Sequence, residues 1–334
     1  MVAIIVPTMN RSCFIKRLLR FYSNYAAEYT IYIADSSNEE YHIKETKKVI
    51  KSLACSINIK YGYYPDTNIE EAKRLILNQV TQKYAAYCGD DDFLIPDTLK
   101  KCAEFLELNP DYSNCHGTGM RLKMKDDSLY GYIEAVSEYK LLGNEFDDPY
   151  TRVGVYLNDY WPIWTVRRVD EFRKTLKLLK NIPVESFREI TMGCVPIIQG
   201  KTKLINNLYV VRQVHKNRFQ NPSLIEAFLL GDWYASYKEM NGILENEVGK
   251  KTALDKSKLH ETVKQGFVSY YKAGLESQIC KKNPTFLRGL KKIIKQYFPY
   301  VMLIRASLMI RNQKPEYYDD FYKVMNFLRK EQLY

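Results

Sequence analysis

The feature that most limits the fold is an alternation of apolar and amphipathic segments over the first 120 residues. Four apolar runs of five residues have the length of buried strands, and the segments between them repeat apolar residues at helical spacing. The predicted strands are residues 2–6, 30–34, 57–61 and 84–88, and the predicted helices are about 13–22, 46–53, 69–80 and 99–108. Strands that alternate with helices predict an α/β fold, with a mostly parallel central sheet flanked by helices.

Beyond residue 115 this alternation ends. The elements predicted next are a strand hairpin over 115–133, a loop-rich stretch over 134–165, helices over 168–181 and 184–193, and short strands at 203–205 and 208–211 around a turn at Asn206-Asn207. From residue 221 onward the pattern predicts helices. The predicted organisation is an α/β domain over residues 1–220, with halves at 1–120 and 121–220, followed by a helical C-terminal region over 221–334.

Composition indicates a globular protein of a reducing compartment. Apolar residues make up 46% and charged residues 27%, which is ordinary for a soluble domain. The seven cysteines are scattered and form no Cys-x-x-Cys pair, so neither a disulfide framework nor a zinc site is expected. The sequence shows no signal peptide, and no apolar run approaches the roughly 20 residues that span a bilayer. We therefore expect a cytoplasmic protein, either free or peripheral on the inner face of the cytoplasmic membrane.

Much of the net charge of +11 gathers near the C-terminus, where eight Lys or Arg and no acidic residue occur between Lys281 and Arg311. Residues 286–298 separate basic and apolar faces at helical spacing, and the apolar residues 300–304 follow. Such a helix either contacts anionic lipid headgroups or packs on the α/β domain with a solvated basic face. Because no nucleic-acid recognition motif accompanies the charge, no nucleic-acid partner is expected.

Three aspartates, Asp90, Asp91 and Asp92, directly follow the fourth predicted strand. They therefore stand at the carboxyl end of a strand, where open α/β sheets bind ligands. Three neighbouring carboxylates repel one another, and Mg²⁺ or Mn²⁺ is a cation that such oxygens bind. The alternative is a turn in which Asp92 or Asp97 caps the following helix. The spacing alone leaves both interpretations open.

Two other predicted strands end in polar residues at the same edge. The first leads into Pro7-Thr8-Met9-Asn10-Arg11, which offers a hydroxyl and free backbone donors but contains no glycine-rich nucleotide-binding loop. The second ends at Asp35-Ser36-Ser37. By chain order, Asp35 should lie beside the turn that follows the first strand. Either segment taken alone is as well explained by a turn or a cap.

Together these segments resemble the family 2 glycosyltransferases of GT-A fold, and most closely a bacterial subgroup that pairs Asp-Asp-Asp-Phe with an N-terminal Pro-Thr-x-Asn-Arg. The resemblance is strongest over residues 2–120, is weaker to about 220 and is absent beyond. Its motifs are Pro7 to Arg11, Asp35 to Ser37, Tyr64 to Asp66, Gly89 to Phe93, Ser186 to Glu189 and Tyr209 to His215. The resemblance implies a Rossmann-like GT-A domain and an inverting, metal-dependent glycosyltransferase. Such an enzyme would transfer a sugar from a nucleotide-sugar donor to a glycan or lipid-linked acceptor, in the synthesis of bacterial surface polysaccharides.

The resemblance also implies roles for single residues. The residues expected to bind the donor lie in the first half of the domain and are Pro7, Thr8, Asn10, Arg11, Asp35, Asp66, Lys73 and Asp91. Asp90 and Asp92 are expected to coordinate Mn²⁺ or Mg²⁺, with His215 as a further ligand. The base that deprotonates the acceptor is Glu189, with Glu185 second, because the usual Glu-Asp pair of the family is missing. Trp161 and Trp164 are expected to stack on the acceptor sugar. For Lys73, His215, Glu189 and both tryptophans, a structural role is the alternative.

Two other functions stay open at this stage. A sugar-phosphate nucleotidyltransferase shares the nucleotide-binding architecture, but residues 7–11 lack the Gly-rich, Arg-Lys-containing loop of those enzymes. A catalytically inactive relative, which binds only nucleotide sugar or a membrane, is left open by the missing Glu-Asp pair. The sequence does not specify the donor sugar, the acceptor, the linkage or the oligomeric state.

Overall fold

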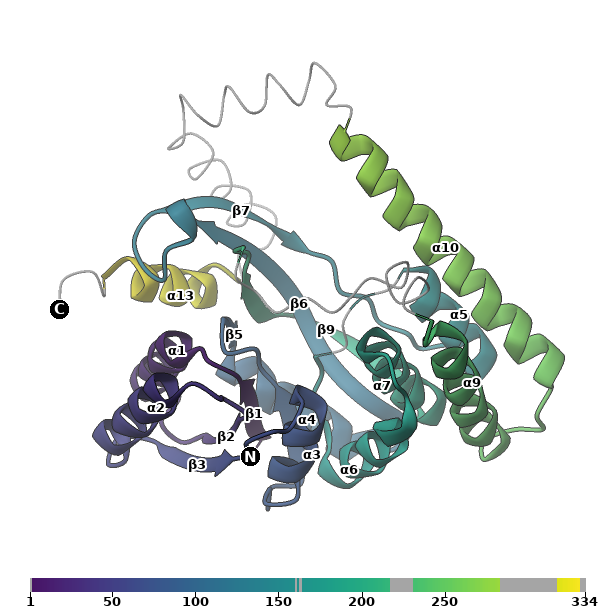
Figure 1. Ribbon diagram of the computed structural model, residues 1–334, viewed down its shortest axis with the longest axis horizontal. Coiled ribbons are helices and arrows are strands. Elements are labelled where there is room, and N and C mark those ends of the chain that lie inside the picture. The colour runs from purple at the N-terminus through teal and green to yellow at the C-terminus, as the bar shows by residue number, and fades with distance from the viewer. Residues whose placement is uncertain (1, 160, 162–163, 217–230, 283–316, 331–334) are drawn as a thin grey trace.

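The computed structural model describes residues 2–159, 161, 164–216, 231–282 and 317–330. Its centre is a five-stranded sheet in the order β3-β2-β1-β4-β8 (Figure 1). The strands are β1 (Val2–Thr8), β2 (Thr30–Asp35), β3 (Asn58–Tyr63), β4 (Tyr84–Tyr87) and β8 (Arg167–Arg168). Strands β1 to β4 run parallel to their neighbours, whereas β8 pairs antiparallel with β4. The predicted parallel arrangement is therefore confirmed, and the short strand β8 is an addition that the sequence did not indicate.

Four helices connect or follow the parallel strands in the predicted order. They are α1 (Ser12–Tyr25), α2 (Glu40–Leu53), α3 (Ile69–Leu77) and α4 (Pro96–Leu108). Helix α3 begins where Asn68 accepts a hydrogen bond from the backbone N–H of Glu71 at 2.9 Å, which satisfies one of the free donors at the helix start.

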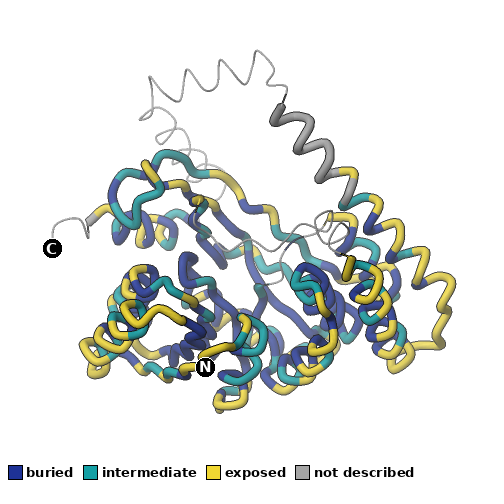
Figure 2. The backbone as a smooth tube through the Cα atoms, viewed as in Figure 1, coloured by how far each residue is buried: buried dark blue, intermediate teal, exposed yellow. Residues whose placement is uncertain are grey.

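Alternate residues of the central strands enter two different hydrophobic cores. In β1, Ile4 and Val6 join the core beneath α1, whereas Ala3 and Ile5 join the core on the opposite face. This follows from the two-residue repeat of a strand that is covered on both sides. Strands β1, β2 and β4 are buried over almost their whole length, whereas the edge strand β3 is partly exposed (Figure 2). Side chains of the three buried strands can therefore face a ligand only at the strand ends.

A second sheet, in the order β5-β9-β6-β7, lies beside the first. Its strands are β5 (Asp92–Leu94), β6 (Tyr112–Met124), β7 (Ile133–Tyr139) and β9 (Lys201–Gln213). Strand β9 pairs parallel with β6 and antiparallel with β5. Because β5 begins at the last of the three aspartates, this pairing brings the end of β9 to the edge of the central sheet.

The predicted strand pair around Asn206-Asn207 is wrong, since residues 201–213 form one continuous strand. The register with β6 shifts between His116 and Thr118, and the extra residues of β9 bulge there. Gly117 makes room for the bulge, because a Cβ at this position would lie 2.1 Å from the carbonyl oxygen of Asn207. Two adjacent asparagines are typical of a turn, and here they occupy a β-bulge instead.

The predicted loop-rich stretch 134–165 is also wrong over about half of its length, because it contains β7 and the helix α5 (Pro149–Asn158). The side chain of Asp148 caps α5 by accepting hydrogen bonds from the N–H groups of Tyr150 and Thr151. Proline in the first turn suits this start, since it has no N–H to satisfy. Asp148 and Pro149 are residues typical of a helix start as well as of a loop, so composition alone did not indicate α5.

The next two helices agree with the prediction. They are α6 (Val169–Leu178) and α7 (Glu185–Gln199). Helix α7 packs closely on α5, and a Cβ at Gly193 would lie 2.1 Å from the hydroxyl of Tyr156. The sequence therefore needs glycine here for the two helices to approach.

The helical C-terminal region is confirmed for its described residues by α9 (Trp233–Gly249), α10 (Lys256–Lys282) and α13 (Tyr318–Lys330). The predicted basic helix at 286–298 and the apolar residues 300–304 lie outside the described residues. Helix α13 packs back on the α/β domain, where the ring of Phe327 lies 5.4 Å from Phe21 and 6.2 Å from Phe93. A boundary near residue 220 therefore does not divide the chain into two separate cores (Figure 1).

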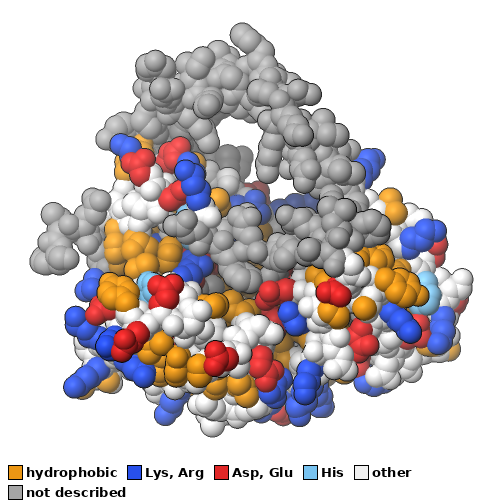
Figure 3. All heavy atoms as spheres, in the orientation of Figure 1, with side chains coloured by type: hydrophobic (Ala, Val, Ile, Leu, Met, Phe, Trp, Pro, Cys, Tyr) orange, Lys and Arg blue, Asp and Glu red, His pale blue; other side chains and the backbone are white. Residues whose placement is uncertain are grey.

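The surface carries mixed charge. Figure 3 shows Lys and Arg side chains interspersed with Asp and Glu over the described part of one face. Ion pairs one helical turn apart account for part of this mixture, as between Lys44 and Glu40 on α2. Within the described ranges, no helix has both the length and the apolar character that crossing a bilayer requires.

Candidate active site

The carboxyl ends of β1, β2 and β4 meet at one edge of the central sheet. Thr8 at the end of β1 is the register partner of Asp35 at the end of β2, and the N–H of Ser36 donates to the carbonyl oxygen of Thr8 at 3.0 Å. On the other side of β1, the N–H of Cys88 donates to the carbonyl oxygen of Ile5 at 2.9 Å. The expected proximity of Asp35 to the turn after the first strand is therefore confirmed.

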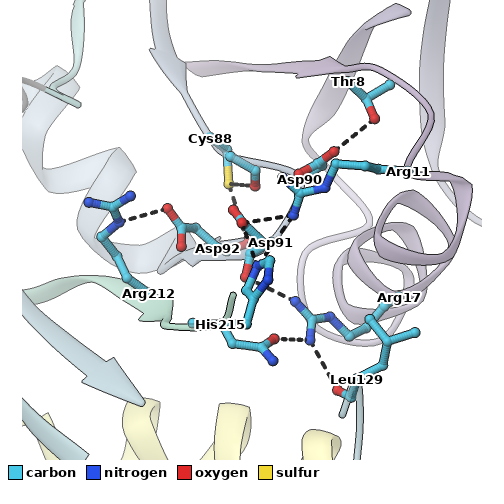
Figure 4. Close-up of polar contacts among 12 residues, drawn as sticks. Thr8, Arg11, Arg17, Cys88, Asp90, Asp91, Asp92, Leu129, Arg212 and His215 are labelled. Atoms are coloured by element: carbon cyan, nitrogen blue, oxygen red, sulfur yellow. Dashed lines mark hydrogen bonds and ion pairs between the residues drawn. The ribbon is translucent and has the colours of Figure 1, made fainter. Parts of the chain in front are cut away.

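All three aspartates are buried at this edge, and the side chain nearest to each one differs (Figure 4). The hydroxyl of Thr8 donates to Asp90 Oδ2 at 2.8 Å. Asp91 Oδ2 accepts from Arg11 Nη2 at 2.8 Å and lies 2.9 Å from His215 Nε2. Asp92 turns the other way, toward Arg212, whose Nε donates to its Oδ2 at 2.9 Å. The capping alternative is wrong, because the cap position of α4 is occupied by Ile95.

Arg11 is the point on which several of these groups converge. Its Nη2 lies 2.8 Å from Asp91 Oδ2, 3.3 Å from Asp90 Oδ1 and 3.4 Å from His215 Nε2. Its guanidinium also lies 4.3 Å from the ring centroid of Phe14, which stacks on His215 at 5.0 Å. The guanidinium thus supplies the positive charge between the first two carboxylates.

A second arginine holds the backbone behind the aspartates. Arg17 is fully buried, and its Nη2 donates to the carbonyl oxygen of Asp91 at 2.9 Å. Its Nη1 donates to the carbonyl oxygen of Leu129 at 3.0 Å and to the side-chain oxygen of Gln213. Burial lowers the pKa of Arg17 to about 10, so the group remains charged at neutral pH. Arg17 therefore ties together the aspartate loop, the β6–β7 hairpin and the end of β9.

The three carboxylates differ in their affinity for protons. Burial raises the pKa of Asp90 to about 7 and that of Asp92 to about 6. Burial acts in the same direction on Asp91, but the hydrogen bond with His215 and the charge of Arg11 hold the pKa of Asp91 well below its usual range. Asp91 is thus ionised at any physiological pH, whereas Asp90 and Asp92 titrate nearer neutrality.

The structure brings together only some of the predicted metal ligands. Among the residues it describes, no group of three or more His, Cys, Asp or Glu side chains is arranged to hold a metal ion as it stands. Asp90, Asp91 and His215 instead surround Arg11 Nη2 at hydrogen-bond distances. Bonds from these ligand types to Mg²⁺ or Zn²⁺ are about 2.0–2.2 Å long, so the three would have to draw inward by about 1 Å. The donor types suit a divalent cation, and their present spacing suits a guanidinium.

Three residues predicted to bind the donor lie on the side of β2 and β3. Asp35 is fully buried and accepts hydrogen bonds from the hydroxyl of Tyr61 and the N–H of Ser37, both at 2.9 Å. Asn10 and Asp66 adopt left-handed backbone conformations, with φ of 55° and 57°. Asn and Asp adopt this conformation more readily than other residues that carry a side chain. Asp66 is exposed at this edge.

The predicted bases lie on a different part of the edge, at the start of α7. Glu185 is the first residue of this helix and Glu189 lies one turn later, and both are half-buried. Burial, followed by the nearby charge of Glu70, raises the pKa of Glu185. Lys73 pairs with Glu70 at 2.7 Å and lies 5.1 Å from the ring centroid of Tyr87, the last residue of β4. Lys73 and Glu70 therefore lie between Glu185 and the end of β4 as its charged neighbours.

The two predicted acceptor tryptophans have different surroundings. Trp161 is buried in the second core and packs edge-on against Tyr156 at 5.3 Å, which agrees with the structural alternative. Trp164 is partly exposed, and its ring would lie 3.2 Å from a Cβ at Gly89. The guanidinium of Arg212 lies 4.8 Å from the ring centroid of Trp164. Trp164 is thus the tryptophan that borders the aspartate loop.

Sequence reasoning assigned no role to Arg17 or Arg212, although both hold the aspartates. A signal for Arg17 was present, because it lies on the same stripe of α1 as the buried residues Phe14 and Phe21. A basic residue on an apolar stripe indicates a buried partner. For Arg212 there was none, since its contact with Asp92 depends on pairing between β5 and β9, which are distant in sequence.

Comparison with known proteins agrees with this geometry. The structure of S. aureus TarS matches with a TM-score of 0.50 at 14% identity, over 81% of this chain and 44% of TarS. S. aureus TarS 1-349 in complex with UDP-GlcNAc matches with a TM-score of 0.52 at 15% identity, over 81% of this chain and 73% of that chain. The complex of TarS 1-349 with UDP matches with a TM-score of 0.50 at 15% identity, over 80% and 72%. At such identity the likeness shows the fold alone, and it is the GT-A fold of a glycosyltransferase.

The sequence itself narrows the class. The profile of glycosyl transferase family 2 matches residues 3–182, which is more than half of the chain. The chain therefore belongs to glycosyl transferase family 2. A comparison with curated protein sequences finds no match. The chain spans less than half of the length of full TarS.

Proposed function

We propose that the protein transfers a sugar from a nucleoside diphosphate sugar to a glycan or lipid-linked acceptor, with inversion at the anomeric carbon. The observation that carries the proposal is the convergence of the ends of β1, β2 and β4 with His215, which follows β9, at one edge of the sheet. TarS, which shares the fold, has been solved in complex with UDP-GlcNAc and with UDP, and this supports a donor of the same general kind.

The nucleoside would lie along the ends of β1, β2 and β3. Pro7 and Asn10 border this part of the edge, and Asp66 is exposed beside it. Asp35 keeps its bonds to Tyr61 and Ser37, and would bind the base through its remaining lone pairs.

The donor diphosphate would face Thr8, Arg11 and the aspartate loop. Mn²⁺ or Mg²⁺ would be held there by Asp90 and Asp91 together with His215, because Asp92 is engaged by Arg212. When bound, such a cation supplies Lewis-acid stabilisation of the departing diphosphate. The roles of the chain itself are to orient the carboxylates, through Thr8 and Arg17, and to bind the donor, in part through Lys73.

Inverting transfer requires a base that takes the proton of the acceptor hydroxyl. Glu189 is the proposed base, with Glu185 as the second candidate. Both are half-buried on one face of α7, and a carboxylate whose pKa is raised toward neutrality, as at Glu185, holds a proton better than a free one. Trp164 would stack on the acceptor sugar, whereas Trp161 is buried in the second core.

The proposed setting is the synthesis of bacterial surface polysaccharide in the cytoplasm, or at the inner face of its membrane. The sequence of residues 286–298 supports contact with an anionic membrane, although that segment lies outside the described residues. No feature of the described residues favours a nucleotidyltransferase, and the family match speaks for glycosyl transfer.

The test is a panel of nucleotide sugars and free nucleoside diphosphates, each with and without Mn²⁺, read by thermal unfolding and by release of nucleoside diphosphate. Stabilisation by at least one nucleoside diphosphate is expected, together with slow hydrolysis of the matching sugar donor. The Asp91→Asn variant serves as the site control, and Asp97→Asn, an exposed residue of α4, serves as the surface control. Equal behaviour of the wild type and Asp91→Asn across the whole panel would refute the proposal.

A further inference from the structure

Arg11 occupies the position that a cation would take at this site. Its Nη2 is surrounded by Asp91 Oδ2 at 2.8 Å, Asp90 Oδ1 at 3.3 Å and His215 Nε2 at 3.4 Å. All three contacts share this one nitrogen, so moving it away from the cluster breaks all of them at once. A divalent cation that used these three ligands would need the volume in which that nitrogen now lies.

The contacts of the Arg11 side chain lie within this cluster. Arg11 is the residue before α1, and its side chain makes no capping hydrogen bond to the helix. Its Nε is buried without a hydrogen-bond partner among the described residues. The ring of Phe14 supports the guanidinium from one side at 4.3 Å. The polar contacts of this side chain are therefore with the cluster and not with the backbone of α1, so its removal should leave the helix start intact.

We propose that Arg11 and a divalent cation exclude one another at the point between Asp90, Asp91 and His215. Arg11 is then a built-in competitor that neutralises the carboxylates when no cation is bound and lowers the affinity for the cation. The inference rests on the proposed function, because it concerns the same cation site at the same edge of the sheet. It predicts something that the family match does not, namely that this arginine sets the metal affinity of the protein.

The experiment is a titration of the full chain with Mn²⁺ in the absence of nucleotide, in which electron paramagnetic resonance counts the free ion. Arg11→Met removes the guanidinium and keeps the apolar stem over Phe14. Arg212→Met is the matched control, because it removes a positive charge from the same cluster but leaves the point between Asp90 and Asp91 filled. Circular dichroism confirms that each variant is folded.

Arg11→Met is expected to bind Mn²⁺ about tenfold more tightly than the wild type or better, since a hydrogen bond to a charged group must no longer be broken. Arg212→Met is expected to stay within about threefold of the wild type. In the Arg11→Met background, His215→Ala should remove most of the gain, which places the ion at this point. Arg11→Gln, a smaller change, should show the same direction of effect.

Three results would overturn the inference. Equal affinity in Arg11→Met and the wild type would show that Arg11 does not compete. An equal gain in Arg212→Met would show a general effect of charge. Failure of every Arg11 variant to bind Mn²⁺ would show that the three residues form no cation site. Binding of nucleoside diphosphate, measured separately in EDTA, reports on the proposed function independently of these outcomes.

Discussion

Asp92 and Arg212 face one another directly across the pairing of β5 with β9, and the side-chain ion pair at 2.9 Å joins the same two residues. The hydroxyl of Tyr139 accepts a second hydrogen bond from this arginine at 3.2 Å. The last aspartate of the motif therefore belongs to β5, and its ion pair ties this short strand to β9 within the second sheet. The motif divides into two carboxylates that contact Arg11, Asp90 and Asp91, and one that joins two strands of the second sheet.

This division predicts unequal effects of removing charge along the motif. Asp91→Asn should lower glycosyl transfer by about 10²–10³-fold, since it loses the contacts of a preorganised charged group. Asp92→Asn should lower transfer less and stability more, because it disturbs the pairing with Arg212. The measurements are turnover of the donor identified by the panel and urea unfolding of each variant. A complete loss of transfer with unchanged stability in Asp92→Asn would contradict the division.

Arg17 is expected to contribute mainly to stability. Arg17→Met leaves the carbonyl oxygens of Asp91 and Leu129 buried without their donor, which should lower the free energy of unfolding by about 3 kcal/mol or more. Lys16→Met, at an exposed position on the same helix, should change it by less than about 0.5 kcal/mol. Urea unfolding at neutral pH compares the two. Equal stability of both variants would mean that the aspartate loop does not depend on Arg17.

The base assignment predicts a selective loss of chemistry. Glu189→Gln should lower the transfer rate by about 10²–10⁴-fold, while the binding of nucleoside diphosphate stays unchanged. Glu185→Gln should have a smaller effect. Single-turnover transfer and nucleotide binding by calorimetry separate the two quantities. If Glu185→Gln shows the larger loss, the base is Glu185, and near-normal transfer in both variants would remove the base from α7.

The raised pKa of Asp90 predicts that the free energy of unfolding depends on pH. Burial raises the pKa of Asp90 to about 7 in the folded protein, above the value of about 4 that an unfolded chain gives. The folded protein therefore binds this proton more tightly, and the stability it contributes is present below pH 4 and is lost as pH rises through about 7. In EDTA, Asp90→Asn should gain stability relative to the wild type between pH 5 and pH 8.5. A constant difference across that range would contradict the raised pKa.

Helix α13 predicts a stability effect far from the site in sequence. Phe327→Ala should lower the free energy of unfolding by about 3–5 kcal/mol, because the ring packs against Phe21 and Phe93 in the first core. Lys323→Ala, an exposed position on the same helix, is the control and should change it by less than about 0.5 kcal/mol. Thermal unfolding of the full chain compares the variants. A small effect of Phe327→Ala would mean that the α/β domain is complete without α13.

Local patterns predicted much of this fold. The strands at 2–6 and 84–88 and the helices between them leave a local pattern in the sequence, as apolar runs for the strands and apolar residues at helical spacing for the helices. The aspartates could be assigned to a ligand edge for the same reason. The strand β5, the bulge at Asn206-Asn207 and the pairing with Arg212 were missed, since each depends on a partner strand that is distant in the sequence.

The same distinction applies to the candidate site. The residue types at the ends of β1 and β4 indicated carboxylates beside a basic turn, and the structure places them together. The spacing of residues in the sequence could not predict that Arg11 Nη2 lies between Asp90 and Asp91. Its position depends on the directions of the side chains, which are set by the contact of Arg11 with Phe14 and of Asp90 with Thr8.

The docking of α13 has a consequence for how the protein is made. During translation Phe93 leaves the ribosome long before Phe327, so the nascent α/β half emerges with Phe21, Phe93 and Tyr130 still lacking the ring that covers them. Contacts between such distant parts of a chain form slowly, and apolar surface stays open in the meantime. The aspartates next to Phe93 thus gain their full support only late in synthesis, after the helical region has been added.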